Sequence, residues 1–257
     1  MNETKTIDEK LDGQHACLYP PNSWCNSARK RAFDVIFSSI LLCVFLPLLV
    51  VLAFVVRVTS KGSILFRQRR PGRGKQEFHI MKFRTMVVNE RSPGPALTRA
   101  DDPRVTWIGR HLRKWKLDEL PQLLNVFRGD MSFVGPRPQP TKLWNDTSIQ
   151  EQASYVLSVR PGITSHATLN FRNEEELLGL LTSTEVEDVY LKTIMPVKLK
   201  MELEYLRRAT FRSDISIILK TILRIVHRGE PESEMVAVPI VPPTEQKRLR
   251  AVAGSSD

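Results

Sequence analysis

Two adjacent carboxylates, Asp118 and Glu119, are the residues of this 257-residue sequence whose type and spacing best suit chemistry. They lie in the segment LRKWKLDELPQLLNVFRGDMSFVGPRP, residues 112–138. A helix is predicted to start around Asp118, to accept Pro121 in its first turn and to end at Gly129. The structural alternative is an acidic helix cap, which stabilises a helix by about 0.3–2 kcal/mol. For an arbitrary Asp-Glu pair before a proline, the cap is the better interpretation.

Basic residues in short, turn-bounded segments favour a chemical role for this pair. Arginine forks bind phosphate oxygens through paired hydrogen bonds. One carboxylate can hold Mg²⁺ against a diphosphate, and a second can attack phosphorus to form an acyl phosphate. A phosphate-transfer site requires these groups to converge, which the sequence alone does not show. The candidate basic residues are Lys82 and Arg84 in KFRTM, Arg113, Arg137 between Pro136 and Pro138, and Arg160 in RPGIT.

The element expected to place this site at a membrane is an apolar run of 24 residues, from Phe33 to Val56, in which Asp34 is the only charge. Its length and hydropathy are typical of a transmembrane helix. Pro47 removes a helix hydrogen bond in the middle of the run, which predicts a kink or break there. The halves would be roughly 21 Å and 14 Å long, and each is too short for a hydrocarbon core of about 30 Å.

Lysine and arginine flank both ends of the apolar run, and such charges mark the cytoplasmic side of a membrane. The pattern favours a helix over residues 29–60 that enters the membrane, breaks at Pro47 and returns to the same face. A kinked single span is the alternative, because proline is tolerated in spanning helices.

The remaining elements are predicted from turn signals and periodicity. Short strands at 64–66 and 78–80 flank a turn rich in glycine and proline, which indicates a hairpin. Residues 88–103 read as a loop. Ser213 is a candidate N-cap for a helix whose apolar stripe is predicted to pack on the domain, with the bilayer interface as the alternative. The stripe consists of Ile215, Ile218, Leu219, Ile222 and Val226.

Composition narrows the partners without choosing among them. Lys and Arg number 38 against 28 Asp and Glu, so the net charge is +10. An anionic partner is implied: phosphorylated substrates, an acidic membrane surface or nucleic acid. Cys17, Cys25 and Cys43 form no metal-binding pattern, which indicates reduced thiols in a cytosol-facing protein.

The chain resembles the bacterial sugar transferase family, the monotopic phosphoglycosyl transferases. The resemblance is collinear from about Lys30 to Arg228, and the long central string is highly specific. It rests on KRAFD, LFRQRRPGRG, FHIMKFRTM, DDPRVTWIGRHLRKWKLDELPQLLNVFRGDMSFVGPRP and RPGIT. Longer members add spanning helices upstream, and the short N-terminus here predicts the minimal form.

The resemblance implies transfer of a sugar 1-phosphate from a UDP-sugar to polyprenyl (undecaprenyl) phosphate, with release of UMP. It implies Asp118 as the nucleophile of a covalent phosphosugar intermediate and Glu119 as the Mg²⁺ ligand. Lys82, Arg113, Arg137 and Arg160 would contact phosphates. The turn Pro136-Arg137-Pro138 would help to seat the uridine, and Pro47 matches the family's membrane break.

Two segments depart from the family pattern. The break, often Ser-Pro in the family, is Leu46-Pro47 here, so the geometry of the break is open. After RPGIT many members continue GLAQVNGR, but residues 165–178 read SHATLNFRNEEELL. That segment is expected to contact the sugar or to shape its pocket, so the sugar is not copied from relatives.

The sequence therefore predicts a predominantly helical α+β fold: a re-entrant membrane helix, a short hairpin and a cytosolic catalytic domain with interfacial helices at 61–228, between flexible tails at 1–28 and 229–257. The expected place is the cytoplasmic face of the bacterial inner membrane, with Mg²⁺ as cofactor. The expected partners are a UDP-sugar, polyprenyl phosphate and inner-membrane lipids, with a homodimer as a further candidate and no nucleic acid. The alternative is a basic, membrane-anchored binding protein without catalysis, which leaves KFRTM and LDELPQLLNV unexplained.

Overall fold

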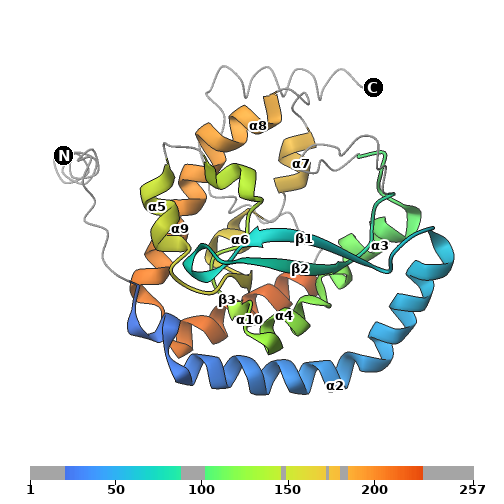
Figure 1. The fold of residues 1–257 in the computed structure, drawn as a ribbon, viewed down its shortest axis with the longest axis horizontal. Coiled ribbons are helices and arrows are strands. Elements are labelled where there is room, and N and C mark those ends of the chain that lie inside the picture. Colours follow the sequence, from blue (N-terminus) through green and yellow to red (C-terminus); the bar gives the residue numbers. More distant parts are fainter. Residues whose placement is uncertain (1–20, 88–101, 146–148, 172–173, 180–184, 228–257) are drawn as a thin grey trace.

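The protein is mostly helical, with two small sheets at its centre (Figure 1). The computed structural model describes residues 21–87, 102–145, 149–171, 174–179 and 185–227. The predicted tails lie outside these residues except for 21–28, as does most of the predicted loop at 88–103. The predominantly helical α+β class is confirmed, and the long apolar helix near the N-terminus is present.

That helix, α2, runs from Ala28 to Thr59 and continues through Pro47. It bends in its middle, so that its two halves border the rest of the molecule along two sides (Figure 1). Proline provides no N–H for the carbonyl of Cys43, which weakens the helix at this level. The hydroxyls of Ser38 and Ser39 both donate to the carbonyl of Val35, at 3.1 and 2.7 Å, and therefore do not serve the carbonyl freed by Pro47. The helix is thus bent and remains helical.

The inner face of α2 packs against the domain on both sides of Pro47. Before the proline, Phe33 and Phe37 lie against Phe133, with ring centroids 6.1 and 4.9 Å apart. After it, Leu52 and Val56 form a second buried cluster with Phe83 and Leu112. The outer face stays exposed and apolar, and it consists of Ile36, Ile40, Val44, Leu46, Val50, Val51, Phe54 and Val58.

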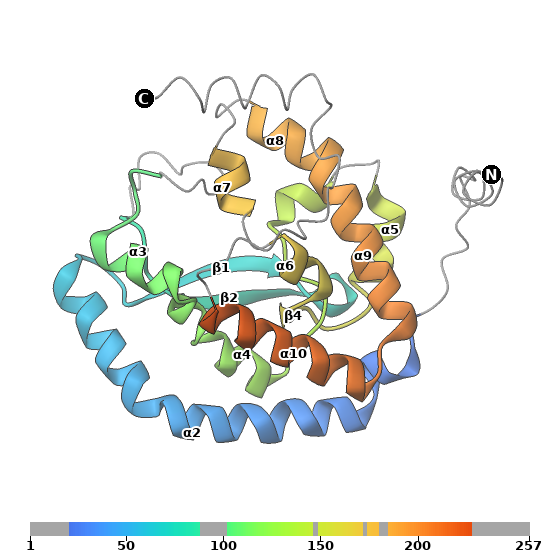
Figure 2. The same ribbon diagram turned by 180° about the vertical axis from the view of Figure 1, so that it is seen from behind.

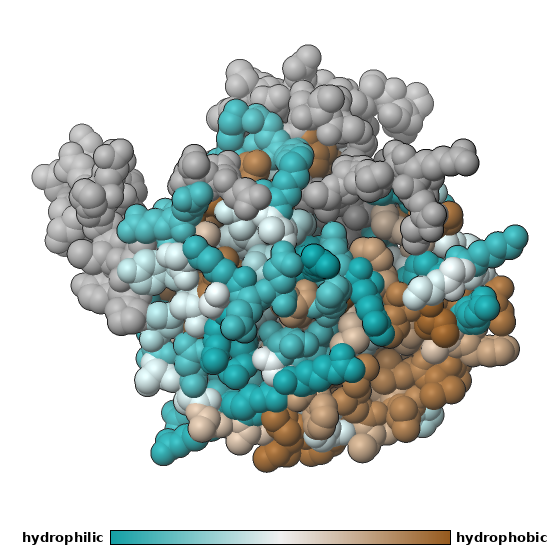
Figure 3. Space-filling view, viewed as in Figure 1, coloured by the Kyte–Doolittle hydropathy of each residue, from teal (hydrophilic) through white to brown (hydrophobic). Residues whose placement is uncertain are grey.

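The hydrophobic surface lies over α2, at the lower right of Figure 3. Among the described residues, α2 is the helix long and apolar enough to cross a membrane.

The predicted hairpin is confirmed, with longer strands than the short apolar segments indicated. β1 (Leu65–Pro71) pairs antiparallel with β2 (Glu77–Phe83), in a register that places Leu65 opposite Phe83. Gly74, with φ 68°, turns the chain between the strands. The exposed Arg67 and Arg69 of β1 alternate with the less exposed Gln68 and Arg70, so a search for apolar residues does not detect the strand.

The remaining elements surround a second sheet, in which β3 (Ser132–Val134) runs parallel to β4 (Gly162–Thr164). A π-helical turn, Tyr190–Ile194, joins α8 to α9. The helices are α3 (Trp107–Lys114), α4 (Gln122–Arg128), α5 (Gln150–Val156), α6 (His166–Asn170), α7 (Glu174–Gly179), α8 (Glu185–Val189), α9 (Met195–Arg208) and α10 (Phe211–Val226).

The prediction for α10 was wrong in two respects. The N-cap is Thr210, whose hydroxyl accepts from the amide of Ser213 in a capping box, so the helix begins earlier than predicted. The predicted core stripe is largely the outer face, since Leu219, Ile222 and Val226 are at least half exposed. The inner face is set by polar anchors that periodicity does not reveal: Asp214 is fully buried and Thr221 lies 2.7 Å from Thr164.

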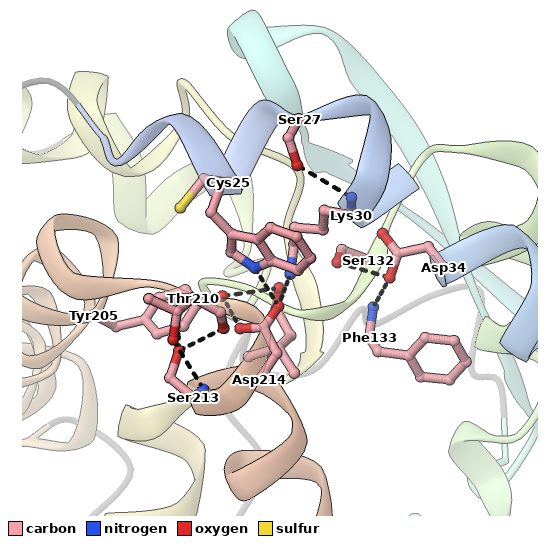
Figure 4. A network of polar contacts seen from close by, with 12 residues as sticks. Cys25, Ser27, Lys30, Asp34, Ser132, Phe133, Tyr205, Thr210, Ser213 and Asp214 are labelled. Atoms are coloured by element: carbon pink, nitrogen blue, oxygen red, sulfur yellow. Dashed lines mark hydrogen bonds and ion pairs between the residues drawn. The ribbon is translucent and has the colours of Figure 1, made fainter. Parts of the chain in front are cut away.

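A buried ion pair joins the start of α2 to the start of α10. Lys30 pairs with Asp214, which also accepts from Trp24 Nε1 at 2.9 Å and from the Tyr205 hydroxyl at 2.7 Å (Figure 4). Nearby, Asp34 accepts from the Ser132 hydroxyl at 3.1 Å and from the backbone amide of Phe133. These contacts hold α2, α9, α10 and β3 together, and they account for the one charge in the apolar run.

Candidate active site

The carboxylate pair lies on a short 3₁₀ turn, Leu117–Glu119, between α3 and α4. The predicted helix start at Asp118 was wrong, because α4 begins only at Gln122, with Pro121 as its N-cap. Its predicted end is confirmed: Gly129 adopts φ 95° as the C-cap. Lys116, just before the pair, has left-handed backbone angles, φ 54° and ψ 21°. Such strain in a non-glycine residue is typical of functional sites.

Glu119 is clamped by two cations from distant segments. Lys82 Nζ, on β2, lies 2.8 Å from Glu119 Oε1. The Arg137 fork donates from Nη2 to Oε1 at 2.6 Å and from Nη1 to Oε2 at 3.3 Å. Burial by itself would raise the pKa of Glu119, but the charges of Arg137 and Lys82 outweigh it and hold the pKa well below its ordinary value. Glu119 is therefore a carboxylate at neutral pH.

Asp118 has the opposite environment. It is 6% exposed, and among the described residues its Oδ1 has no hydrogen-bond partner. Burial raises the pKa of Asp118, and the negative charge of Glu119 adds to the effect, while Lys82, Lys116 and Arg113 partly offset it. Two neighbouring carboxyls whose pKa values are pushed apart are typical of a site with two distinct chemical roles.

The turn that carries Arg137 is built by close approach of two glycines. Gly162 donates to the carbonyl of Pro136 at 2.9 Å, and Gly135 donates to that of Thr164 at 3.1 Å. A Cβ on Gly162 would lie 2.2 Å from the amide nitrogen of Gly135, so a side chain there would separate the strands. The motifs VGPRP and RPGIT therefore lie against each other and are joined by backbone hydrogen bonds. Their prolines border a small cavity lined by Pro71, Pro136, Arg137, Pro138, Trp144, Val156, Leu157, Val159 and Pro161.

The other predicted basic residues divide into two groups. Arg113 Nε donates to Thr85 Oγ1 at 3.0 Å, and its charge acts on Asp118, so the structure brings it to the site. Arg84 binds the carbonyls of Ser60 and Ser63 instead, in the turn after α2. A Cβ on Gly62 would lie 2.8 Å from Arg84 Nη1, so this turn is shaped around the arginine.

Arg160 also makes a structural contact, because its Nε donates to the carbonyl of Gly129 at 3.0 Å, at the C-cap of α4. Arg84 and Arg160 therefore bind backbone carbonyls at the ends of α2 and α4 and help to hold these helices in place. Their role in binding phosphate stays a prediction.

Sequence reasoning missed Arg70, at the end of β1. Its Nη2 donates to Gln68 Oε1 at 2.5 Å, while its Nε is buried without a partner among the described residues. Burial and the charge of Arg137 lower the pKa of Arg70 to about 10, and the charge of Glu119 counteracts them. A buried guanidinium beside another cation is suited to an anion. Its position in the run RQRRPGRGK concealed it, since five of the nine residues there are basic.

The donor set suits Mg²⁺ only if substrate supplies most of the ligands. Among the residues that the structure describes, no group of three His, Cys, Asp or Glu side chains could hold a metal ion. Glu119 offers one carboxylate, and the unpartnered Oδ1 of Asp118 lies on the adjacent residue. Mg²⁺ is commonly held by one or two carboxylates together with phosphates and water, and the pair fits that arrangement.

The carboxylate pair and its cations belong to a domain that packs against the apolar helix α2, and comparison with known proteins identifies the family of this domain. The model of the family described as "Bacterial sugar transferase" matches residues 25–228. The chain belongs to this family.

Several known proteins resemble the chain, and the names of some of them state a sugar donor. The chain is 38% identical over 196 residues to the UDP-glucose:undecaprenyl-phosphate glucose-1-phosphate transferase of Caulobacter vibrioides, covering 76% of this chain and 68% of that protein. It is 32% identical to an Aeromonas hydrophila UDP-N-acetylgalactosamine-undecaprenyl-phosphate N-acetylgalactosaminephosphotransferase, covering 88% of this chain and 51% of the relative. It is also 32% identical to the exopolysaccharide production protein ExoY of Rhizobium meliloti, covering 75% and 83%. The chain spans about two fifths of several other relatives, among them the Escherichia coli glucose-1-phosphate transferase.

Proposed function

We propose that the protein transfers a sugar 1-phosphate from a UDP-sugar to polyprenyl phosphate and releases UMP. The product would start the assembly of an exopolysaccharide, capsule, O-antigen or glycoprotein glycan. The observation that carries the proposal is the pair Asp118 and Glu119. Glu119 contacts Lys82 and Arg137, whereas the buried Asp118 keeps an Oδ1 without a partner among the described residues. Relatives named as transferases from UDP-glucose or UDP-N-acetylgalactosamine to undecaprenyl phosphate support the substrate classes.

In the first half-reaction, a carboxylate oxygen of Asp118 attacks the phosphorus that bears the sugar. The bond from this phosphorus to the bridging oxygen breaks, and its electron pair leaves with UMP. The result is an acyl phosphate between Asp118 and the phosphosugar. The free Oδ1 supports this assignment, because a nucleophile needs an uncommitted oxygen.

Glu119 has a different role, because the charges of Arg137 and Lys82 lower its pKa and keep it a carboxylate, the form that binds a metal. When bound, Mg²⁺ would neutralise charge on the diphosphate, with Glu119 as its protein ligand. Arg137, Lys82 and Arg70 then hold phosphate oxygens in line with Asp118. The charge of Arg113, with those of Lys82 and Lys116, favours the ionised form of the nucleophile. Pro136 and Pro138, beside the cavity that includes Trp144, would seat the uridine.

In the second half-reaction, a phosphate oxygen of polyprenyl phosphate attacks the same phosphorus. The bond to Asp118 breaks, the carboxylate is restored, and the polyprenyl diphosphate sugar leaves. The polyprenyl chain stays in the bilayer, and only its phosphate has to reach Asp118. The site must therefore lie at a membrane surface.

The apolar outer face of α2 supports this location (Figure 3). So do the exposed Leu219, Ile222 and Val226 of α10, a helix on the near side of the molecule in Figure 2. Both halves of α2 contact the catalytic domain, which supports a helix that enters the cytoplasmic leaflet of the inner membrane and returns at Pro47. A helix that crossed the bilayer would carry one half away from the domain.

The replacement Asp118→Asn tests the proposal, since it keeps the shape of the side chain and removes the nucleophile. We expect it to abolish both UMP release from UDP-sugars and a trapped phosphosugar adduct, measured by a UMP assay and by intact-protein mass spectrometry. The matched control is Asp188→Asn, an exposed aspartate on α8 paired with Lys192. Full turnover by Asp118→Asn would exclude Asp118 as the nucleophile.

Loss of folding does not explain the expected loss of activity. A carboxyl whose pKa is raised in the folded protein costs stability at neutral pH, because the unfolded state ionises more easily. Asp118→Asn is therefore expected to unfold at the same temperature as the wild type or higher at pH 7, with the difference shrinking as pH falls.

The metal role of Glu119 has its own test. Glu119→Gln leaves Arg137 and Lys82 without their counter-ion and removes the proposed ligand, so UMP release should fall at least about 100-fold. In thermal-shift titrations with UMP present, Mg²⁺ should stabilise the wild type and not the variant. Glu204→Gln, an exposed glutamate on α9, serves as the control. An unchanged Mg²⁺ titration in Glu119→Gln would contradict the ligand role.

A further inference from the structure

A second cavity, of about 360 Å³, lies against the hairpin, and the proposed mechanism does not use it. Arg67 and Met81 are direct cross-strand partners, so their side chains lie on the same face of the hairpin. Lys82, which contacts Glu119, is the next residue along β2 and projects from the opposite face. The hairpin therefore separates this cavity from the candidate active site. The polar lining of the cavity, beside Met81, includes Arg67, Glu77, His79, Arg128 and Asp130.

The end of α4 forms the second wall of the cavity and is joined to β2 by side-chain contacts. Asn125 Nδ2 donates to the carbonyl of His79 at 2.8 Å and to Asp130 Oδ2 at 3.1 Å. Arg128 Nη1 lies 3.9 Å from Met81 Sδ. These contacts hold Asp130 near His79 and Arg128 near Met81.

The cations of the cavity gather around Met81. Arg67 is the cross-strand partner of Met81, and Arg128 contacts its sulfur. Both arginines are exposed, and neither is paired with a carboxylate among the residues that the structure describes. Two neighbouring guanidinium groups without counter-ions favour a phosphate, whose oxygens they bind through paired hydrogen bonds.

The carboxylates lie toward the other end of the cavity. Asp130 is held near His79, and His79 and Met81, two residues apart on one face of the strand, are separated by about 7 Å. Glu77 is two residues further along, beside the turn of the hairpin. Asp130 Oδ2 accepts from a neutral amide, and the pair of Glu77 with Arg69, at 3.8 Å, is exposed and weak. Both carboxylates can therefore accept from a further cation, so the cavity suits a ligand with a phosphate and an ammonium group.

This cavity lies close to the place where α2 meets the domain. Arg31, near the start of α2, donates to the carbonyls of Val126 and Phe127 at 2.6 and 2.7 Å. Arg128 follows immediately, and the Phe127 side chain is 47% exposed. In Figure 1 and Figure 2, α4 lies between the hairpin and the first half of α2. An exposed aromatic ring and an arginine beside an apolar helix are typical of the headgroup region of a membrane.

We propose that this cavity binds the headgroup of an aminophospholipid of the membrane. Arg67 and Arg128 hold the phosphate, and Asp130 and Glu77 accept hydrogen bonds from the ammonium group. An anionic lipid offers no cation to the two carboxylates, and the quaternary ammonium of a choline lipid has no N–H to donate. The inference rests on the membrane location in the proposed function and does not depend on the reaction.

The test measures lipid binding to the full chain in a neutral detergent by isothermal titration calorimetry. The probes are short-chain phosphatidylethanolamine, phosphatidylcholine and phosphatidylglycerol, together with soluble phosphoethanolamine. We expect phosphatidylethanolamine to bind at least about tenfold more tightly than each of the other three. It alone combines a phosphate, a hydrogen-bonding ammonium group and acyl chains.

Variants at the two ends of the cavity test the two halves of the headgroup. Arg67→Gln removes one phosphate contact at an exposed position and should weaken binding of phosphatidylethanolamine about tenfold. The matched control is Arg73→Gln, an exposed arginine in the turn of the hairpin and outside the cavity lining, which should leave binding unchanged. Asp130→Asn keeps an acceptor for Asn125 and removes a negative charge, so it should narrow the preference for phosphatidylethanolamine over phosphatidylglycerol. If Asp130→Asn unfolds, Glu77→Gln tests the same end of the cavity at an exposed position.

The outcomes distinguish this inference from the proposed function. Equal affinity for the three lipids, or tighter binding of phosphatidylglycerol, would overturn the choice of an aminophospholipid. Phosphoethanolamine that binds as tightly as the lipid would overturn it in favour of a site for a soluble phosphate. Arg67-dependent lipid binding by a wild type that releases no UMP would sink only the proposed reaction. UMP release with lipid binding indifferent to Arg67 would sink only the inference.

Discussion

The ionisation of Asp118 depends on a balance between its burial and the cations around it. Burial and Glu119 raise the pKa of the carboxyl, while Lys82, Lys116 and Arg113 oppose that rise. A nucleophilic carboxylate must be ionised to attack phosphorus, and a raised pKa also makes it more basic. Because burial raises the pKa of Asp118, the reaction rate should begin to fall at a higher pH than it would with an ordinary aspartate as the nucleophile.

This balance predicts a pH dependence with a defined sign. Single-turnover UMP release should fall about tenfold per pH unit below the raised pKa of Asp118. Lys116→Met removes a charge that lowers this pKa, so the acidic limb should move to higher pH. Lys114→Met, which alters an exposed lysine at the end of α3, is the control and should leave the limb in place. A limb that moves to lower pH in Lys116→Met would contradict the assignment of the titrating group to Asp118.

At the scale of elements, α2 holds the domain through one face and offers the opposite face to its surroundings. Arg31 near its start donates to the carbonyls of Val126 and Phe127 at 2.6 and 2.7 Å, and so caps the end of α4. Asn125 of α4 in turn binds the carbonyl of His79 and the amide of Met81 on β2. The helix that carries the apolar surface is thus linked through α4 to the strand that carries Lys82.

The topology of α2 is testable by labelling. Single cysteines at Ser23→Cys and Lys61→Cys, both at exposed positions, are placed in a variant without native cysteines. If the helix re-enters, a membrane-impermeant maleimide should label both from the cytoplasmic side and neither from the periplasmic side. A cysteine retained at position 43, on the apolar face, should resist the reagent until detergent is added. Labelling of positions 23 and 61 from opposite sides would establish a span.

At the scale of the whole molecule, the two ends of the described chain are joined by the buried cluster in Figure 4. Lys30 and Asp214, 184 residues apart, are 6% and 1% exposed as side chains. A buried pair adds little over a well-packed apolar pair, but removing one partner leaves an uncompensated charge. The ion pair therefore adds little net stability, and its main effect is to fix the position in which α2 docks on the domain.

Asp214→Leu should lower stability by about 3–5 kcal/mol, because Lys30 loses its counter-ion while Trp24 and Tyr205 lose an acceptor. Thermal unfolding in detergent should show a fall of roughly 6–20 °C. The double variant Lys30→Met/Asp214→Leu should recover part of the loss. Lys142→Met disrupts an exposed pair and should change the midpoint by about 2 °C or less. A single variant as stable as this control would show that the pair is dispensable.

The sequence by itself determined the local and linear features: the apolar run, the carboxylate pair, the hairpin, the end of α4 at Gly129 and the family. These depend on residue types within a few positions of one another, which glycine, proline and periodicity record directly. Only the tertiary structure decided which basic residues meet the pair. Arg137 and Lys82 reach Glu119 from segments 18 and 37 residues away, whereas Arg84 and Arg160 bind backbone carbonyls.

The inner face of α10 and the surroundings of Arg70 were also decided by the tertiary structure. Each depends on buried polar partners brought together from separate elements, such as Asp214 with Lys30 or Glu174 with Lys198. Apolar periodicity does not predict such pairs, because a charged residue is assigned to the surface unless its buried partner is known. The physical reason is that burial of a charge is stabilised by long-range contacts, and these exist only once the chain has folded.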